Sequence, residues 1–145
     1  MTIKLDSQQI ELVGRAALEA ELIRNGFEVA QPARDRGIDL IAYSDDPDKP
    51  FAAIPIQMKV SSGESFGVYR KYEKFNNLVM VHIWNVLDEP RFFVVPYEES
   101  LQFVPDLDGH SWQNNKLYTW TKTPKHIQEK LAVYEDGWDI LARQM

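Results

Sequence analysis

"RDRGIDLIAYSDDPDKPFAAIPIQMKVSSGE", residues 34–64, holds two apolar segments separated by a cluster of turn-forming residues. Such segments are typical of neighbouring strands. Asp39 begins the first segment, and Gln57 and Lys59 lie within the second. Charged and amide side chains are costly at such positions unless something binds them. The stretch therefore predicts two strands whose polar side chains need a partner.

Gln57 and Lys59 are two residues apart, and alternation along a strand puts both side chains on one face. The other face is apolar and consists of Ile54, Ile56 and Met58. Together with the Asp39 carboxylate, an amide oxygen and an ammonium group at a sheet edge suit a divalent cation with oxygen ligands. Such a cation lowers the pKa of a bound water, which Lys59 would position or deprotonate. We expect Mg²⁺, because it tolerates few protein ligands and keeps several waters.

Apolar periodicity and turn residues predict the elements around these strands. A helix is expected over 7–25, with Ser7 as its N-cap and Gly26 just beyond its last turn. The further expected elements are strands at 27–32, 38–44 and 51–60, a short helix at 69–77, strands at 78–86 and 91–97, a loop with a short strand at 107–120 and a closing helix at 124–144. This order predicts an α/β or α+β fold in which helices pack against a mixed sheet.

The composition bounds the function classes. The 145 residues are 44% hydrophobic and 26% charged, which is typical of a folded protein, and we expect one domain with a core at about 7–100 and a C-terminal extension at about 101–145. The net charge of −6 argues against indiscriminate nucleic-acid binding, so any basic surface must be local. The absence of cysteine excludes disulfides and thiolate metal sites. With no membrane-length apolar stretch and no signal-peptide pattern, we expect a cytoplasmic protein without a membrane partner.

The quoted stretch resembles a known superfamily. "GIDLIA" followed by "IQMK", behind a helix that ends "AELIRNGFEV", is similar to the PD-(D/E)XK nucleases. More narrowly, it resembles branches related to Holliday-junction resolvases and type IV restriction endonucleases, in which the motif is Asp followed by Gln-x-Lys. The resemblance covers about residues 12–97. It implies a restriction-endonuclease-like αβββαβ core and, as the reaction, metal-dependent hydrolysis of phosphodiester bonds in DNA.

The resemblance also implies roles for individual residues. Asp39 and Gln57 would hold Mg²⁺, for which Mn²⁺ could substitute, the Met58 carbonyl would assist, and Lys59 would serve the attacking water. Superfamily members often carry a Glu on the first helix, where this chain has Gly14 and Arg15. The candidates one turn away are Glu11 and Glu19, and helical spacing favours Glu19 because it lies beside Leu12 at the edge of the apolar arc. A homodimer or a targeting partner is also consistent with the resemblance.

A basic and aromatic segment follows Lys59. Tyr69, Arg70, Lys71 and Lys74 could contact a phosphate backbone and stack on bases. In the alternative, Tyr72 and Phe75 pack on the sheet and the lysines face water. Both interpretations stay open on the sequence alone.

Each site residue also has a plain structural interpretation. Asp39 could accept backbone hydrogen bonds at a strand start or pair with Arg34 or Arg36, and Gln57 and Lys59 could lie on a solvated edge strand. Asp35 is either a second acidic contact or part of a turn. His82 is expected to be a half-buried strand residue.

Two further function classes therefore stay open. One is a catalytically inactive nucleic-acid-binding or protein-binding module that keeps the nuclease fold, because Gln57 replaces an acidic residue and Arg15 stands where a Glu is usual. The other is an interaction protein whose interface is the aromatic segment "HSWQNNKLYTW".

Overall fold

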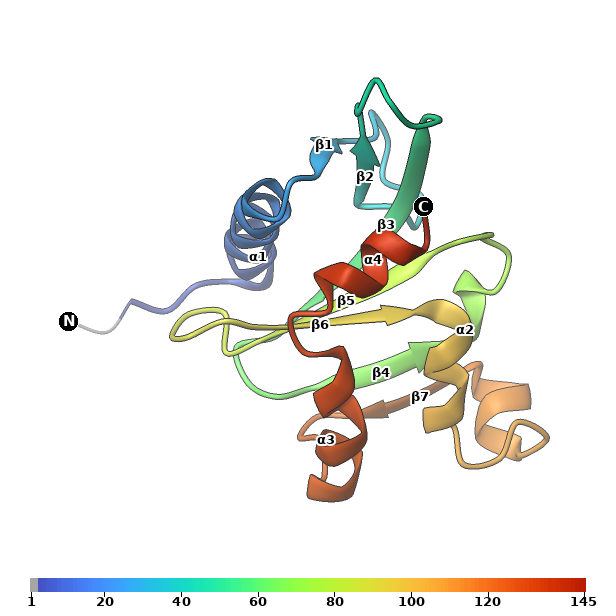
Figure 1. The fold of residues 1–145 in the computed structure, drawn as a ribbon. Coiled ribbons are helices and arrows are strands. Elements are labelled where there is room, and N and C mark those ends of the chain that lie inside the picture. The colour runs from blue at the N-terminus through green and yellow to red at the C-terminus, as the bar shows by residue number, and fades with distance from the viewer. Residues whose placement is uncertain (1–2) are drawn as a thin grey trace.

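The computed structural model describes residues 3–145, and its central feature is a five-stranded mixed sheet (Figure 1). The helices and strands are α1 (Ser7–Arg24), β1 (Glu28–Ala30), β2 (Leu40–Ser44), β3 (Ala52–Val60), β4 (Phe66–Tyr69), β5 (Val79–Trp84), β6 (Arg91–Pro96), α2 (Tyr97–Ser100), β7 (Leu117–Trp120), α3 (Lys125–Leu131) and α4 (Trp138–Arg143). No helix among the described residues is both long and apolar enough to span a bilayer.

The sheet order is β1-β2-β3-β5-β6, in which β3 and β5 are parallel and the other neighbours are antiparallel. A second sheet consists of β4 and β7. The predicted α/β class, with helices packed against a mixed sheet, is confirmed. The chain crosses between the parallel strands β3 and β5 through β4 and a single 3-10 turn at Arg70–Tyr72.

The two faces of the five-stranded sheet bury separate apolar clusters. On one face, α1 and α4 cover alternate residues of β3 and β5, among them Ile56 and Val81. On the other face, β4, α3 and the segments around α2 cover the remaining phase of β5 and β6, including Met80 and Val95. Gln57 and Lys59 share this second face, because Ile54, Ile56 and Met58 all belong to the first cluster.

Helix α1 approaches the sheet closely at one point. A Cβ atom on Gly14 would lie 2.5 and 2.6 Å from the two Cγ atoms of Val60 on β3. The helix therefore packs its backbone directly against the strand, with Leu18 and Leu22 fully buried one and two turns further on. This contact fixes how far the first turns of α1 stand from the end of β3.

The helix limits follow local capping. Asp6, rather than the predicted Ser7, is the N-cap of α1, since its side chain accepts the Gln9 amide and the Gln9 side chain accepts the Asp6 amide. Gly26 follows the helix with a φ of 87°, as the sequence predicted.

Three sequence predictions are wrong in detail. The helix expected at 69–77 is only the turn at Arg70–Tyr72, and the strand β4, which precedes this turn, was not predicted. The closing helix at 124–144 is broken into α3, a 3-10 turn and α4. The break arises because Asp136, with a φ of 51°, donates its amide to Phe92 of β6, while Glu135 bridges Phe93.

We expect Gly14→Ala to destabilise the protein by about 1–3 kcal/mol, because the added methyl group overlaps Val60 and drives α1 away from β3. Chemical denaturation of the variant measures this change.

The matched background is Val60→Ala, which removes both clashing Cγ atoms. There Gly14→Ala should cost less than in the wild type, because only the Cβ atom of residue 60, at 3.1 Å, stays close and because alanine is the better helix former. An equal loss in both backgrounds would show that the Gly14–Val60 contact does not set the helix position.

Candidate functional site

Asp39 lies where β2 and β3 separate, and it is held from three sides. Its amide donates to the Ile56 carbonyl at 2.8 Å, and its Oδ2 accepts the Met58 amide at 2.8 Å. The side chain thus continues the pairing with β3 beyond Leu40, the first residue of β2. Only 3% of the residue is exposed, and burial raises the pKa of the Asp39 carboxyl, although the Met58 hydrogen bond lowers it in part.

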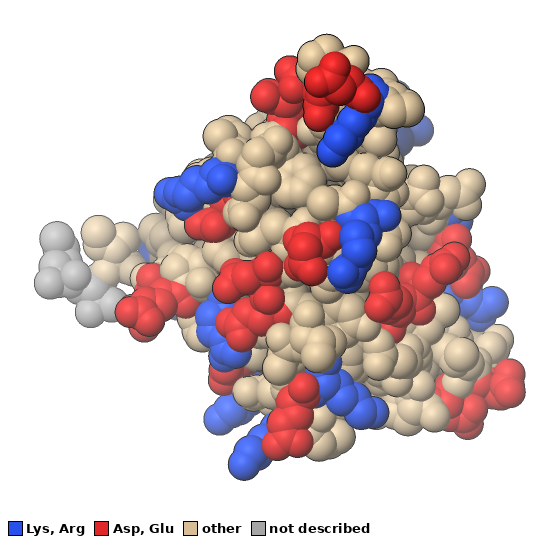
Figure 2. Space-filling model, viewed as in Figure 1, with Lys and Arg blue, Asp and Glu red and all other residues tan. Residues whose placement is uncertain are grey.

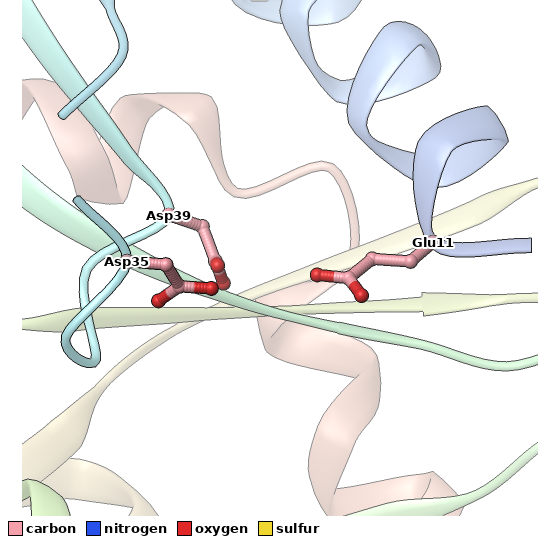
Figure 3. A group of neighbouring side chains, drawn as sticks. All are labelled: Glu11, Asp35 and Asp39. Carbon is pink, nitrogen blue, oxygen red and sulfur yellow. The ribbon is translucent and has the colours of Figure 1, made fainter. Parts of the chain in front are cut away.

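Two more carboxylates face Asp39. Glu11 points from the first turns of α1 toward Asp35 and Asp39, which come from the segment before β2 (Figure 3). One oxygen from each of the three side chains lies within 4.8 Å of the others. Gly37 holds this segment, because its φ of 98° favours glycine and any Cβ atom there would lie only 3.0 Å from the Phe75 ring.

Gln57 extends the acidic cluster with a neutral oxygen. The residue is 8% exposed, and its Nε2 donates to the Met58 carbonyl at 3.4 Å. Its Oε1 is buried without a hydrogen-bond partner in the described part of the chain. A buried acceptor of this kind is normally satisfied, so the Gln57 oxygen has unused capacity to bind a ligand.

Lys59 is half-buried at the end of β3, and its Nζ lies 4.4 Å from the ring centroid of Tyr69 and 5.3 Å from that of Tyr72. These aromatic faces hold the ammonium group by cation–π attraction. Among the described residues, no carboxylate forms an ion pair with it, whereas seven other ion pairs are present. The Lys59 charge is therefore available to a phosphate.

Two adjoining cavities contain these side chains. The smaller cavity measures about 220 Å³, and its walls include Glu11, Asp39, Gln57 and Met58. The larger, about 400 Å³, is lined by Asp35, Arg36, Gly37, Gln57, Lys59, Lys71, Tyr72, Lys74 and Phe75. Because Gln57 and Lys59 line both, an acidic cavity opens directly into one with four cationic side chains.

Arg15 contacts Asp39 from α1. Its Nη1 donates to the Asp39 carbonyl at 3.0 Å, and its Nη2 lies 3.8 Å from Oδ1. The sequence had suggested Arg34 or Arg36 as partners of Asp39. The docking of α1 at Gly14 instead brings Arg15 to this carboxylate.

The structure distinguishes between Glu11 and Glu19, the two glutamates on α1 that the sequence offered as site residues. Glu19 accepts a hydrogen bond from Gln31 and does not belong to the acidic cluster, whereas Glu11 does. The preference for Glu19 came from its place beside Leu12, but Leu12 is 63% exposed, so that arc faces solvent.

Only some of the basic residues that follow β4 line the larger cavity. Lys71 and Lys74 are exposed and line the larger cavity with Lys59, and Tyr69 stands on the far side of Lys59. Arg70 is directed elsewhere, with an ion pair to Glu73 at 3.5 Å and a hydrogen bond to Gln113 at 3.2 Å. Figure 2 shows acidic and basic side chains interspersed over the face of α1, α3 and α4, so the cationic cavity is a local feature of an acidic protein.

His82 is buried more deeply than the sequence analysis predicted. It was expected to be half-buried, but 1% of it is exposed and neither ring nitrogen has a hydrogen-bond partner within residues 3–145. The fully apolar neighbours along β5 were the available signal, because all six residues of that strand are buried.

No protein-family model and no curated protein matches the sequence. Among solved structures, the fold is similar to that of I-Ssp6803I, a bacterial homing endonuclease. The superposition has a TM-score of 0.57 with 15% sequence identity and covers 97% of this chain and 94% of that chain. The chain therefore shares an endonuclease fold along nearly its whole length.

The raised pKa of Asp39 predicts how metal-free stability depends on pH. A carboxyl whose pKa is higher in the folded than in the unfolded state loses folding free energy as pH rises from about 4 through the folded value. Asp39→Asn keeps an acceptor for the Met58 amide and removes this loss. We expect the variant to be at least as stable as the wild type at pH 7 in EDTA, with its relative advantage fading toward pH 4, as measured by thermal melting.

Asp108→Asn, at an exposed turn, is the control and should follow the wild-type pH profile. A variant at Asp39 that is less stable than the wild type, increasingly so at higher pH, would mean that the ionised carboxylate stabilises the fold.

Proposed function

We propose that this protein is a metal-dependent endonuclease of the PD-(D/E)XK superfamily, which hydrolyses phosphodiester bonds in DNA. The observation that carries the proposal is the buried Oε1 of Gln57, which has no hydrogen-bond partner within residues 3–145. Gln57 lines one cavity together with the acidic cluster and Lys59. These groups come from α1, the segment before β2, and β3. Their convergence is poorly explained by packing, since buried polar groups are expected to be satisfied.

The donor set suits Mg²⁺. Asp39, Glu11 and Asp35 supply carboxylate oxygens, Gln57 supplies an amide oxygen, and the Met58 carbonyl lies at the same cavity. Hard divalent cations favour oxygen ligands of these kinds, and Mn²⁺ accepts the same set. When bound, such an ion lowers the pKa of a coordinated water and balances charge on a phosphate.

The protein side chains have distinct tasks in this reaction. Asp39 and Gln57 hold the ion, with Glu11 as the supporting carboxylate from α1. Lys59, two residues beyond Gln57 on the same face, orients the attacking water and stabilises the charge that develops on the phosphate. Lys71 and Lys74, on the wall of the larger cavity, hold neighbouring phosphates of the strand.

The likeness to a homing endonuclease supports this assignment at the level of the fold. DNA is the proposed substrate because the cationic cavity adjoins the acidic one, so a phosphate backbone bound there would lie beside the ligand oxygens. The acidic protein as a whole would give weak non-specific binding, so cleavage depends on a defined DNA structure or on a targeting partner.

Isothermal titration with Mn²⁺ tests the metal site. We expect Asp39→Asn and Glu11→Gln each to weaken Mn²⁺ binding by roughly tenfold or more, because loss of even a supporting group costs that much at metal sites. Glu19→Gln is the matched control on the same helix and should bind as the wild type does. Equal losses in the two glutamate variants, or no binding to wild type, would contradict the metal assignment.

A plasmid-nicking assay tests the reaction. Lys59→Ala should retain Mn²⁺ binding while nicking falls by on the order of a hundredfold or more, because Lys59 acts on the water and the phosphate rather than on the ion. Nicking that survives this change with unaltered rate would remove Lys59 from the reaction.

One contact favours the alternative of a catalytically inactive binding module. Arg15 already supplies a positive charge to the Asp39 carboxylate, at 3.8 Å, and could take the place of a metal ion there. In this alternative the fold binds DNA or protein, and the Arg15–Asp39 pair is structural.

Arg15→Gln distinguishes the two functions. If the acidic cluster is a metal site, removing the competing cation should raise Mn²⁺ affinity by roughly two- to fivefold, a modest gain because Arg15 is partly exposed. Arg24→Gln, at the exposed end of the same helix, should leave the affinity unchanged. In the inactive module, Arg15→Gln lowers stability and neither variant binds Mn²⁺, which titration and melting together resolve.

A further inference from the structure

A third cavity lies beyond Lys59, between the central sheet and the β4–β7 pair. It measures about 290 Å³, and its walls include Lys59, Phe66, Tyr69, His82, Thr119 and Trp120. The volume is at the small end of ligand-binding cavities. Because Lys59 also lines both cavities of the acidic site, this third cavity opens beside the position proposed for the scissile phosphate.

His82 gives this cavity an unusual polar wall. It is 1% exposed, and both of its ring nitrogens are buried without a hydrogen-bond partner in residues 3–145. Burial, together with the nearby Lys59 charge, lowers the pKa of His82 to about 3, so the ring is neutral at pH 7. A neutral imidazole offers one N–H donor and one acceptor, and because these point in divergent directions, one of them at a time can pair with the edge of a nucleobase.

The other walls are aromatic. Phe66 lies with its ring centroid 4.3 Å from that of His82 and 6.0 Å from that of Trp120, and Tyr69 stands under the Lys59 ammonium group. Aromatic faces stack on bases without regard to sequence. The cavity therefore combines aromatic walls with one hydrogen-bonding nitrogen of His82, next to the Lys59 cation.

Gly67 lines the cavity on the β4–β7 side, where there is no room for a side chain. A Cβ atom at Gly67 would lie 2.7 Å from Thr119 Cγ2 and 2.9 Å from the Tyr69 hydroxyl. Any side chain there would displace two residues of the cavity wall. The close strand pairing at Gly67 thus holds Tyr69 and Thr119 in position around the cavity.

We propose that this cavity binds the base of an unpaired nucleotide adjacent to the phosphate held at Lys59. The inference rests on the proposed action on DNA and specifies its substrate as DNA that is single-stranded or locally unpaired beside the cleavage point. A base inside a duplex cannot enter a closed cavity without leaving its stack, and the penalty for leaving is smallest where the base is already unpaired. This base satisfies one of the two orphaned His82 nitrogens.

The test compares two strands that differ only in their bases. Fluorescein-labelled single-stranded DNA of roughly 12 nucleotides, within the usual size of single-strand sites, is titrated in EDTA against the same length of abasic backbone, with fluorescence anisotropy as the readout. Wild type should bind the base-containing strand more tightly by on the order of tenfold or more. Equal affinities for the two strands would overturn the inference, as would failure to bind either strand.

Two variants test whether the preference for the base-containing strand arises at this cavity. His82→Leu removes both ring nitrogens, and it should abolish most of the preference while leaving the protein at least as stable as wild type, because two unsatisfied buried groups disappear. Thr119→Phe fills the cavity mouth from an exposed position on β7 and should have the same effect on binding. Leu117→Phe, exposed on the same strand but outside the cavity, is the matched control and should keep the preference.

The outcomes separate this inference from the proposed function. A preference for bases that disappears in Thr119→Phe supports the cavity even in a protein that never nicks plasmid DNA. A preference that persists in both His82→Leu and Thr119→Phe overturns the cavity assignment and means that it holds solvent only. Metal-dependent nicking without a preference for bases overturns the cavity assignment and leaves the nuclease function intact.

Discussion

The hydrogen bond from the Met58 amide to Asp39 Oδ2 is the contact on which the site depends. It lies at the point where β2 stops pairing with β3, so a side-chain oxygen takes over a bond that the strand backbone would otherwise make. This arrangement fixes one oxygen of the carboxylate and buries the group. It also brings Gln57, opposite Asp39, into the opening between the strands.

Helix α1 completes the site from outside the sheet. Its backbone touches β3 at Gly14, and this distance places Glu11 and Arg15, which flank Gly14 on the helix, over Asp39. One residue adds negative charge to the cluster and the other adds positive charge. Arg15 thus offsets part of the negative charge of the cluster, through its contact with Asp39 Oδ1 at 3.8 Å.

Local pattern was sufficient to predict Asp39, Gln57 and Lys59 as a group, because strand alternation and a strand start depend on neighbours in the sequence. The choice between Glu11 and Glu19 could not be predicted, since it depends on where α1 docks along β3. The orphaned state of His82 depends likewise on how β4 packs against β5, as in the contact of Phe66 with His82, which local pattern does not specify. Helix propensity at 124–144 failed because the hydrogen bond from the Asp136 amide to Phe92 and the bridge between Glu135 and Phe93 override it.

The same bridge from Glu135 to Phe93 has a consequence for association between molecules. It covers part of the outer edge of β6, and the opposite edge of the five-stranded sheet is β1, which has only three residues. Neither edge offers a long row of free backbone groups to a strand from another chain. Two copies that associate would therefore meet through side-chain surfaces, and the sheet itself is protected against edge-to-edge growth into fibres.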